Sequence, residues 1–308
     1  MGAGTEAALD AFGIAPSRDV RLPIWARQFP LPLGLLYADH IVAVSPSYAH
    51  EIMTPEFGCG LEGLIQSRSE VVSGILNGLD TQAWDPSTDK VILNQYSKQD
   101  LSPRLANKLT LEQEVGLRPD AETPLLILIS RMDQQKGVDI AIEGLRQTSD
   151  IPWKAILLGT GDPNLEQASR RLEVDFPDRV RTLIRFDANL SRRMYSGGDI
   201  ILMPSRYEPC GLAQMIAMRY GCVPLARSVG GLTDTIRDAA DLIRGNGFLF
   251  DDPTPEDFSK GLRRAAILFG EKAVWSSLQY QGMQSDFSWH QSAVAYLKIY
   301  QSLEERHG

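Results

Sequence analysis

The hydrophobic pattern of the chain changes near residue 124. Beyond that point, short apolar runs alternate with longer amphipathic stretches, which is typical of a parallel sheet with crossover helices. The six apolar runs predict six strands, and therefore one doubly wound α/β domain. The expected strands are residues 125–130, 155–159, 180–186, 199–205, 223–227 and 247–250, and the expected helices are 137–147, 190–197, 211–220, 232–238 and 255–269.

The first eighty residues follow a less regular pattern. Residues 41–45 and 71–75 are expected to be two buried strands, with a helix near 47–53 between them. Two strands cannot form an independent domain with covered edges. We therefore expect this segment to be only part of a second domain.

Two further segments complete the predicted organisation. Residues 80–123 are polar and rich in turn residues, with one expected helix at 107–115, and are interpreted as a hinge. Within residues 291–304, Val294, Leu297, Tyr300 and Leu303 recur at helical spacing, which predicts a final amphipathic helix. The expected divisions are a partial domain at 1–79, a hinge at 80–123, a nucleotide-binding domain at 124–285 and a terminal helix at 286–308 that packs back toward the first domain.

Composition and charge exclude several classes of function but add little to the prediction of the fold. The 308 residues include 31 Lys and Arg and 39 Asp and Glu, a net charge of −8, which disfavours nucleic-acid binding. No apolar run reaches the ~18 residues of a membrane span, and the N-terminus lacks the features of a secretory signal. Cys59, Cys210 and Cys222 are not closely paired, which favours a reducing compartment, by default the cytoplasm. The four histidines lack metal-ligand spacing, so no metal site is expected.

The loops after the predicted strands carry the candidate chemistry, because ligands of open α/β sheets bind beyond the carboxyl ends of the strands. Arg131 and Lys136 follow the first strand of the domain and precede a helix, where an anion meets both charge and free N–H groups. Residues 204–212 follow the fourth strand and place Glu208 close to a helix start at Gly211. The other two loops are glycine turns, with Gly159, Gly161 and Asp162 after the second strand and Gly230 and Gly231 after the fifth.

Together, the cations and the glycine-opened helix starts predict an anionic ligand, most simply a nucleotide diphosphate. Each feature taken singly also has a structural interpretation, as a solvated basic pair or a turn that needs glycine. The chain lacks a Gly-x-x-x-x-Gly-Lys-Ser/Thr loop and a Gly-x-Gly-x-x-Gly dinucleotide motif. Cys210 has no histidine nearby in sequence, so we expect it to be packed or ligand-lining rather than a nucleophile.

These motifs together resemble the bacterial glycogen/starch synthases, retaining ADP-glucose-dependent glucosyltransferases of the two-domain GT-B fold. The resemblance runs from about Leu36 to the C-terminus. It implies one complete Rossmann-like, doubly wound parallel domain and a partial second α/β domain. The matching segments are residues 38–49, 51–58, 74–80, 84–89, the Arg131 to Gly137 loop, Glu208-Pro209-Cys210-Gly211-Leu212 and Asp286-Phe287-Ser288-Trp289.

The resemblance also implies roles for individual residues. Arg131 and Lys136 would hold the donor diphosphate and neutralise the charge that develops on the leaving ADP. Glu208 would face the donor glucose, and Phe186 would stack on adenine, its alternative interpretation being a core strand residue. The remaining implied donor-binding residues are Gly159, Gly161, Asp162, Cys210, Gly211, Leu212, Gly230 and Gly231, with ADP-glucose as donor substrate and no cofactor.

Two departures from the family pattern qualify these expectations. Many GT-B enzymes carry a second Glu at the position of Ile216. The glycogen/starch synthases lack that Glu, so Ile216 agrees with the resemblance to them. The family's N-terminal Lys-x-Gly-Gly-Leu loop and active-site histidine do not appear, and the first 35 residues contain no Lys. We therefore expect the donor-binding half of the enzyme with a remnant of its acceptor-side domain.

The complete enzyme would transfer glucose to the non-reducing end of an α-1,4-glucan. This chain alone would elongate glucan poorly, because transfer needs both walls of the cleft. Two alternatives remain open. One is a non-catalytic nucleotide-sugar-binding or regulatory module, completed by self-association or by another chain. The other is a GT-B transferase with a different donor, since stacking by Phe186 tolerates any base.

Overall fold

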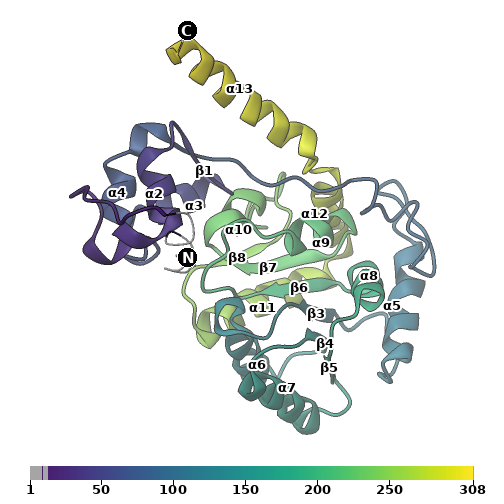
Figure 1. Cartoon of the computed structure of the whole chain (residues 1–308). Coiled ribbons are helices and arrows are strands. Elements are labelled where there is room, and N and C mark those ends of the chain that lie inside the picture. Colours follow the sequence, from purple (N-terminus) through teal and green to yellow (C-terminus); the bar gives the residue numbers. More distant parts are fainter. Residues whose placement is uncertain (1–8, 10–12, 308) are drawn as a thin grey trace. The chain divides into compact units, whose positions relative to one another are not determined.

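The computed structural model describes Leu9 and residues 13–307, and it divides into two compact units (Figure 1). Unit 1 comprises Met1–Asn77 and His290–Gly308, and unit 2 comprises Gly78–Trp289. The segment predicted as a hinge, residues 80–123, lies within unit 2, where its helix α5 (Pro103–Glu114) packs on helix α8 (Ala188–Gly197). Burial of one face of α5, including Leu111, explains why this polar segment belongs to the larger unit.

Unit 2 is built on a six-stranded parallel sheet, as the sequence predicts. Its order is β5-β4-β3-β6-β7-β8, so the direction of winding reverses between β3 and β6. Two strands are shorter than expected: β5 ends at Ile184 rather than residue 186, and β6 spans only Ile200–Met203. The strands are β3 (Leu125–Ile129), β4 (Lys154–Gly159), β5 (Val180–Ile184), β6 (Ile200–Met203), β7 (Val223–Arg227) and β8 (Phe248–Phe250).

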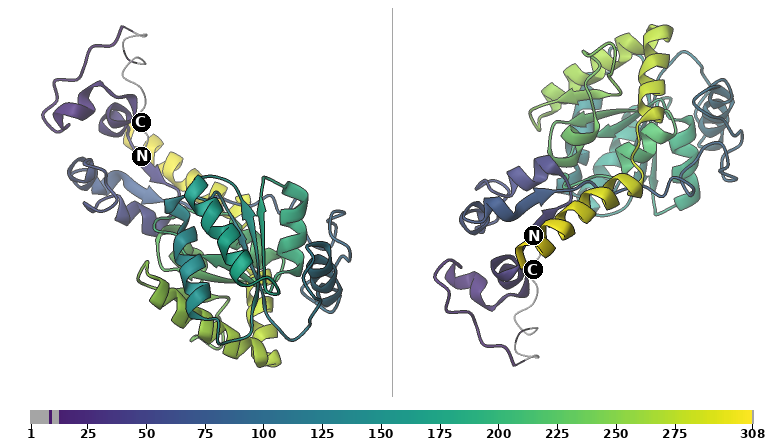
Figure 2. Two further views of the ribbon diagram at one scale, coloured as in Figure 1. Left: turned by 90° about the horizontal axis from the view of Figure 1, so that it is seen from below. Right: turned by 90° about the horizontal axis from the view of Figure 1, so that it is seen from above.

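Helices cover both faces of this sheet. Right-handed crossovers place α6 (Val138–Gln147) and α7 (Pro163–Asp175) on one face, and Figure 2 shows them in front of the strands. The reversed winding after β5 places α8 and α9 (Ala213–Arg219) on the other face. The remaining helices of unit 2 are α10 (Gly230–Thr235), α11 (Pro255–Gly270), which packs on α6, and α12 (Lys272–Gln284), which packs on α9.

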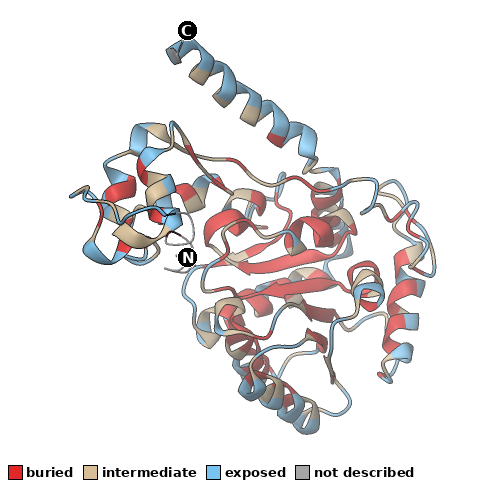
Figure 3. Cartoon of the chain, viewed as in Figure 1, coloured by how far each residue is buried: buried red, intermediate tan, exposed pale blue. Residues whose placement is uncertain are grey.

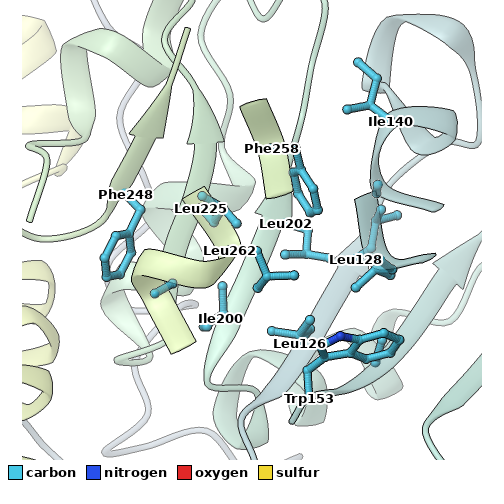
Figure 4. Close-up of a cluster of buried hydrophobic side chains, with 14 of the residues drawn as sticks. Leu126, Leu128, Ile140, Trp153, Ile200, Leu202, Leu225, Phe248, Phe258 and Leu262 are labelled. Carbon is cyan, nitrogen blue, oxygen red and sulfur yellow. The ribbon is translucent and has the colours of Figure 1, made fainter. Parts of the chain in front are cut away.

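The largest core lies between the sheet and the helices α6 and α11 (Figure 4). Alternate residues of the strands, including Leu126, Leu128 and Leu202, point toward this face because side chains alternate along a strand. Phe258 and Leu262 of α11 pack against them. Figure 3 shows the same distribution, with buried residues concentrated in the strands and exposed residues on the outer faces of the helices.

Unit 1 has a small core of its own. Its strands β1 (Ile41–Ala43) and β2 (Val72–Gly74) pair in parallel, both shorter than expected, and the helix α3 (Pro46–Glu51) connects them with a cap from Ser45. The other elements are η1 (Ile24–Gln28), α2 (Pro30–Tyr37), α4 (Glu62–Gln66), η2 (Ser69–Val71) and the predicted terminal helix α13 (Trp289–His307). Among the described residues, no helix combines the length and apolar character needed to cross a bilayer.

Candidate functional site

The loops after β3 and β6 bring Lys136 and Glu208 into direct contact. Lys136 ends the short 3₁₀ helix η3 (Gln134–Lys136), and Glu208 follows β6. Because β3 and β6 are neighbours in the sheet, residues 72 positions apart meet, with Lys136 Nζ 2.6 Å from Glu208 Oε2. Ser205 Oγ donates a second hydrogen bond of 3.1 Å to the same oxygen. The buried Glu208 carboxylate is therefore held in one position at the carboxyl edge of the sheet.

Gly137 and the predicted donor-binding residue Gly231 let neighbouring loops touch. Gly137 has a φ of 64°, and a Cβ atom on it would lie 1.9 Å from the carbonyl oxygen of Pro204. A Cβ atom on Gly231 would lie 2.0 Å from the carbonyl oxygen of Cys210. The Gly231 N–H donates to Glu208 O at 3.0 Å, so it already has an acceptor within the protein. Gly137 therefore lets the Lys136 loop approach the segment before Glu208, and Gly231 lets the start of α10 approach the segment after it.

Arg206 joins the same two loops and was missed by the sequence analysis. Its guanidinium donates to both carboxylate oxygens of Asp139, at 2.8 and 2.7 Å, and to Gln134 O at 2.8 Å. Its backbone N–H donates to Gln135 O at 2.8 Å. Burial would raise the pKa of Asp139, but the hydrogen bonds and charge of Arg206 outweigh it and hold that pKa below its usual value. Arg206 therefore positions the Lys136 segment against the Glu208 segment.

A cavity of about 240 Å³ lies at the same carboxyl edge of the sheet, at the ends of β3, β4 and β5. Arg131, Gly159 and Phe186 line it, together with apolar side chains such as Leu158. Phe186 is 88 % exposed because β5 has already ended, so its interpretation as a core strand residue is wrong. The Arg131 side chain is 69 % exposed and contacts Asp133 at 2.9 Å. An aromatic face and a cation are thus both open to a ligand.

The turn after β4 is built mainly for packing. A Cβ atom on Gly159 would lie 1.9 Å from Ser130 O, and one on Gly161 would lie 2.3 Å from Met132 O. The carboxylate of Asp162 caps α7 by accepting the Asn164 N–H at 2.7 Å. Of these predicted donor-binding residues, Gly159 lines the cavity, whereas the Asp162 carboxylate is occupied by the Asn164 N–H.

The segment after Glu208 turns before its helix begins. Gly211 has a φ of 72°, and α9 starts at Ala213 rather than at Gly211 as expected. Gln214, which the sequence analysis also missed, is fully buried and donates to the carbonyl oxygens of Cys210 and Gly211 at 3.1 and 2.8 Å. The side-chain amide fixes this turn, leaving Leu212 exposed and Cys210 buried. Gly230, with a φ of 46°, begins α10, two residues before the expected start.

Comparison with known proteins identifies the family to which this site belongs. Residues 111–268, about half of the chain, match the family described as glycosyl transferases group 1. The chain belongs to this family. Residues 18–67 match the starch synthase catalytic domain, so the matched segments of this group 1 glycosyl transferase include parts of both units.

Within this family, the chain is similar in sequence to glycogen synthases. The chain is 44 % identical to a glycogen synthase of Anaeromyxobacter sp. (strain Fw109-5) over 273 residues, 89 % of this chain and 58 % of that protein. It is also 44 % identical to a glycogen synthase of Streptococcus gordonii, covering 88 % of this chain and 57 % of the relative. The chain therefore spans little more than half the length of these relatives.

Solved structures agree with the sequence matches. The catalytic domain of starch synthase IV from Arabidopsis thaliana, bound to ADP and acarbose, superposes with a TM-score of 0.83 at 35 % identity, covering 88 % of this chain and 57 % of that one. Sucrose-phosphate synthase from Thermosynechococcus elongatus shares the fold alone, with a TM-score of 0.58 at 19 % identity. The expected resemblance to glycogen/starch synthases and the α/β GT-B fold class are confirmed, whereas the roles of individual site residues stay predictions.

Proposed function

We propose that this chain supplies the nucleotide-sugar-binding side of a retaining glucosyltransferase of the glycogen/starch synthase type. Its donor is ADP-glucose and its acceptor is the non-reducing end of an α-1,4-glucan. The observation that carries the proposal is that the Lys136–Glu208 pair and a cavity lined by Arg131 and Phe186 lie at the same carboxyl edge of the sheet. The similarity to glycogen synthases, and to a starch synthase bound to ADP and acarbose, supports this choice of substrates.

Arg131 and Lys136 act on the departing nucleotide. Rupture of the glycosidic bond to ADP leaves negative charge on the terminal phosphate, and fixed cations lower the barrier where that charge develops. Within the described residues, Lys136 Nζ makes a single hydrogen bond, to Glu208, which leaves two N–H donors for phosphate oxygens. The exposed Arg131 guanidinium adds donors in a planar fork that suits phosphate.

Glu208 acts on the sugar. Lys136 and Ser205 hold its carboxylate, and burial keeps it away from bulk water. A fixed carboxylate beside the donor can orient glucose hydroxyls or stabilise positive charge at the anomeric carbon. The backbone of Cys210, Gly211 and Leu212 continues this wall and would bind sugar and phosphate oxygens.

Phe186 and the cavity beside it would receive the base. The ring is exposed at the cavity wall, and aromatic stacking on a base contributes about 1–3 kcal/mol. Stacking alone does not distinguish adenine from other bases. Preference for ADP over UDP or GDP therefore requires polar contacts to the base edge. In the cavity lining, the hydroxyl groups of Thr160 and Ser191 already donate to Glu166 and Ala188 O, so they can offer acceptors to the base.

Calorimetry tests the donor site. We expect ADP and ADP-glucose to bind, and Lys136→Ala to weaken ADP by about 1.5–3 kcal/mol because it removes charge-assisted hydrogen bonds. Phe186→Ala should weaken ADP while leaving the affinity for pyrophosphate unchanged, because pyrophosphate lacks the base. Tyr280→Ala, which removes another exposed aromatic ring, is the matched control. Titrations with UDP-glucose and GDP-glucose test the base preference.

The outcomes separate the candidate functions. Absence of ADP binding would contradict the donor site itself. Binding of ADP with no incorporation of labelled glucose into glycogen, even when the chain is extended to the full length of its relatives, would favour a non-catalytic binding module. Tighter binding of UDP-glucose or GDP-glucose than of ADP-glucose would favour a transferase with another donor.

A further inference from the structure

Another cavity, lined by charged side chains, lies at the opposite, amino edge of the sheet in unit 2. It has a volume of about 150 Å³ and lies between α5, α12 and the residue that precedes β6. Arg104 and Lys108 of α5, Asp199 before β6, and Phe269 and Trp275 are the lining residues that matter here. Because β6 runs from Asp199 toward Glu208, this cavity is separate from the proposed donor site.

One ion pair in this cavity is complete. Lys108 Nζ lies 2.8 Å from Asp199 Oδ2 and also donates to the carbonyl oxygens of Thr123 and Ala121, at 2.6 and 3.4 Å. Asp199 Oδ2 in turn accepts the Leu125 N–H at 2.8 Å. The pair contributes no net charge, and all three ammonium protons of Lys108 have acceptors.

Arg104 is a second cation, and it forms no ion pair with the described residues. It is only 6 % exposed, and its guanidinium donates to Gly198 O. No carboxylate of the described residues lies within ion-pair distance of it, and its Nε–H is buried without an acceptor there. Burial raises the pKa of the neighbouring Tyr96 and Cys222 far above their usual values, so neither supplies a negative charge. Burial alone would lower the pKa of Arg104, but its interactions with Tyr96 and Asp199 outweigh burial and raise that pKa, so the guanidinium stays charged. Asp199 is already paired with Lys108, so the cavity lining keeps an excess of one positive charge.

Trp275, which also lines this cavity, carries a second unused donor. Its ring is 5 % exposed and packs on Phe248 and Phe269, with centroid distances of 6.2 and 5.2 Å. Its Nε1–H is buried with no acceptor among the described residues. Buried indole N–H groups normally have a partner. The unsatisfied atoms on Arg104 and Trp275 are therefore both donors.

We propose that this cavity binds a small oxyanion, of the phosphate or carboxylate class, between Arg104 and Trp275. Two donors without acceptors and an excess of one positive charge in the lining exclude a cation as the occupant. Water would satisfy the N–H groups but would leave the charge of Arg104 unpaired. The volume corresponds to roughly five water molecules at ~30 Å³ each, which is enough for an ion of this size. Binding would join α5 to α12 and stabilise unit 2.

Tryptophan indole resonances provide a direct test on the whole chain. The five tryptophans should give up to five ¹⁵N–¹H indole signals, and Trp275→Phe assigns the one of interest. Inorganic phosphate is added at constant ionic strength, balanced with a bulky organic sulfonate, and acetate is titrated in parallel. We expect the Trp275 signal to shift saturably while the Trp153 signal does not move, because Trp153 Nε1 already donates to Thr148 O at 2.8 Å. No tryptophan lines the donor cavity, so phosphate bound there would not mimic this result.

Thermal unfolding provides the matched variants. Phosphate should raise the melting temperature of the wild type by binding the native state, and Trp275→Phe and Arg104→Lys should each weaken the apparent phosphate affinity about tenfold. Trp153→Phe, which alters an equally buried indole, should keep the wild-type phosphate dependence. A Trp275 signal that responds to neither anion would show that the cavity holds water only and would overturn the proposal. Equal phosphate dependence in the wild type and Trp275→Phe would also overturn it.

Discussion

Two lysine–carboxylate pairs lie at opposite ends of β6 and serve different purposes. Lys108 contacts Asp199 at the amino edge at 2.8 Å, and Lys136 contacts Glu208 at the carboxyl edge at 2.6 Å. Distance alone does not distinguish them. Each pair also links a residue that flanks β6 to a segment distant in sequence.

The hydrogen bonds of the two lysines differ. Lys108 has three protein acceptors and a side chain only 4 % exposed, whereas Lys136 has one acceptor among the described residues and a side chain 22 % exposed. A lysine whose donors are all used can only support the fold. A lysine with donors left over, at the edge where ligands bind, can support the fold and hold a phosphate as well.

The largest effect is expected from breaking the saturated pair. Lys108→Met leaves Asp199 buried without its cation, which should lower the free energy of unfolding by about 3–5 kcal/mol. ADP affinity of the folded protein should not change, because this pair lies at the edge away from the proposed donor site. Urea denaturation and calorimetry measure the two quantities. Lys260→Met, at an exposed lysine of α11, is the control, and a loss below about 1 kcal/mol for Lys108→Met would contradict the assignment.

Arg131→Ala should show the opposite pattern. Its exposed side chain makes only surface contacts, so the free energy of unfolding should stay within about 0.5 kcal/mol of the wild type. The free energy of ADP binding should become less favourable by about 1.5–3 kcal/mol if the guanidinium binds the diphosphate. Lys260→Ala removes a comparably exposed cation far from the cavity and should change neither quantity. Unchanged ADP affinity in Arg131→Ala would place the anion elsewhere.

Asp139→Asn tests the clamp around Lys136 and should give the smallest effect. Both partners are about one-third exposed, so loss of the ion pair should cost at most about 1 kcal/mol near neutral pH. Because the pKa of Asp139 is lower in the folded protein than its usual value of about 4, the pair stabilises the fold above that pH. Its contribution disappears as the pH falls through the lowered folded pKa.

Urea unfolding across this range measures that pH dependence. The difference between the wild type and Asp139→Asn should therefore narrow below about pH 4. A difference that grows on acidification would contradict this sign. Glu143→Gln, on the same helix but in no ion pair among the described residues, controls for the loss of one carboxylate.

The strands of unit 2 were predictable because nearly every residue of β3 or β6 is apolar and buried on both faces. The helices α7 and α12 were not, since each presents a narrow apolar stripe in a polar segment. In α7 only Leu165 and Leu172 carry the buried apolar face. Pro163 after the capping Asp162 was the signal that marks its start.

The site was predictable where topology decides it. Arg131, Lys136 and Glu208 follow neighbouring strands, so sequence order and winding place them at one edge. Arg206 and Gln214 hold the loops through long side chains that bind Asp139 and Cys210 O, respectively. Residue spacing in the sequence does not indicate which group such a side chain reaches. The exposure of Phe186 likewise depends on β5 ending two residues before it.

The strand order also has a consequence during synthesis. Strand β3 pairs with β6 in the finished sheet, yet seventy residues separate Ile129 from Ile200. At about 5–20 residues per second, translation of that interval takes roughly 4–14 s. For that time the apolar segment Leu125–Ile129 has one unpaired edge at what becomes the centre of the sheet. The ribosome-bound chain therefore presents a strand edge that chaperones or other nascent chains can meet before its own partner exists.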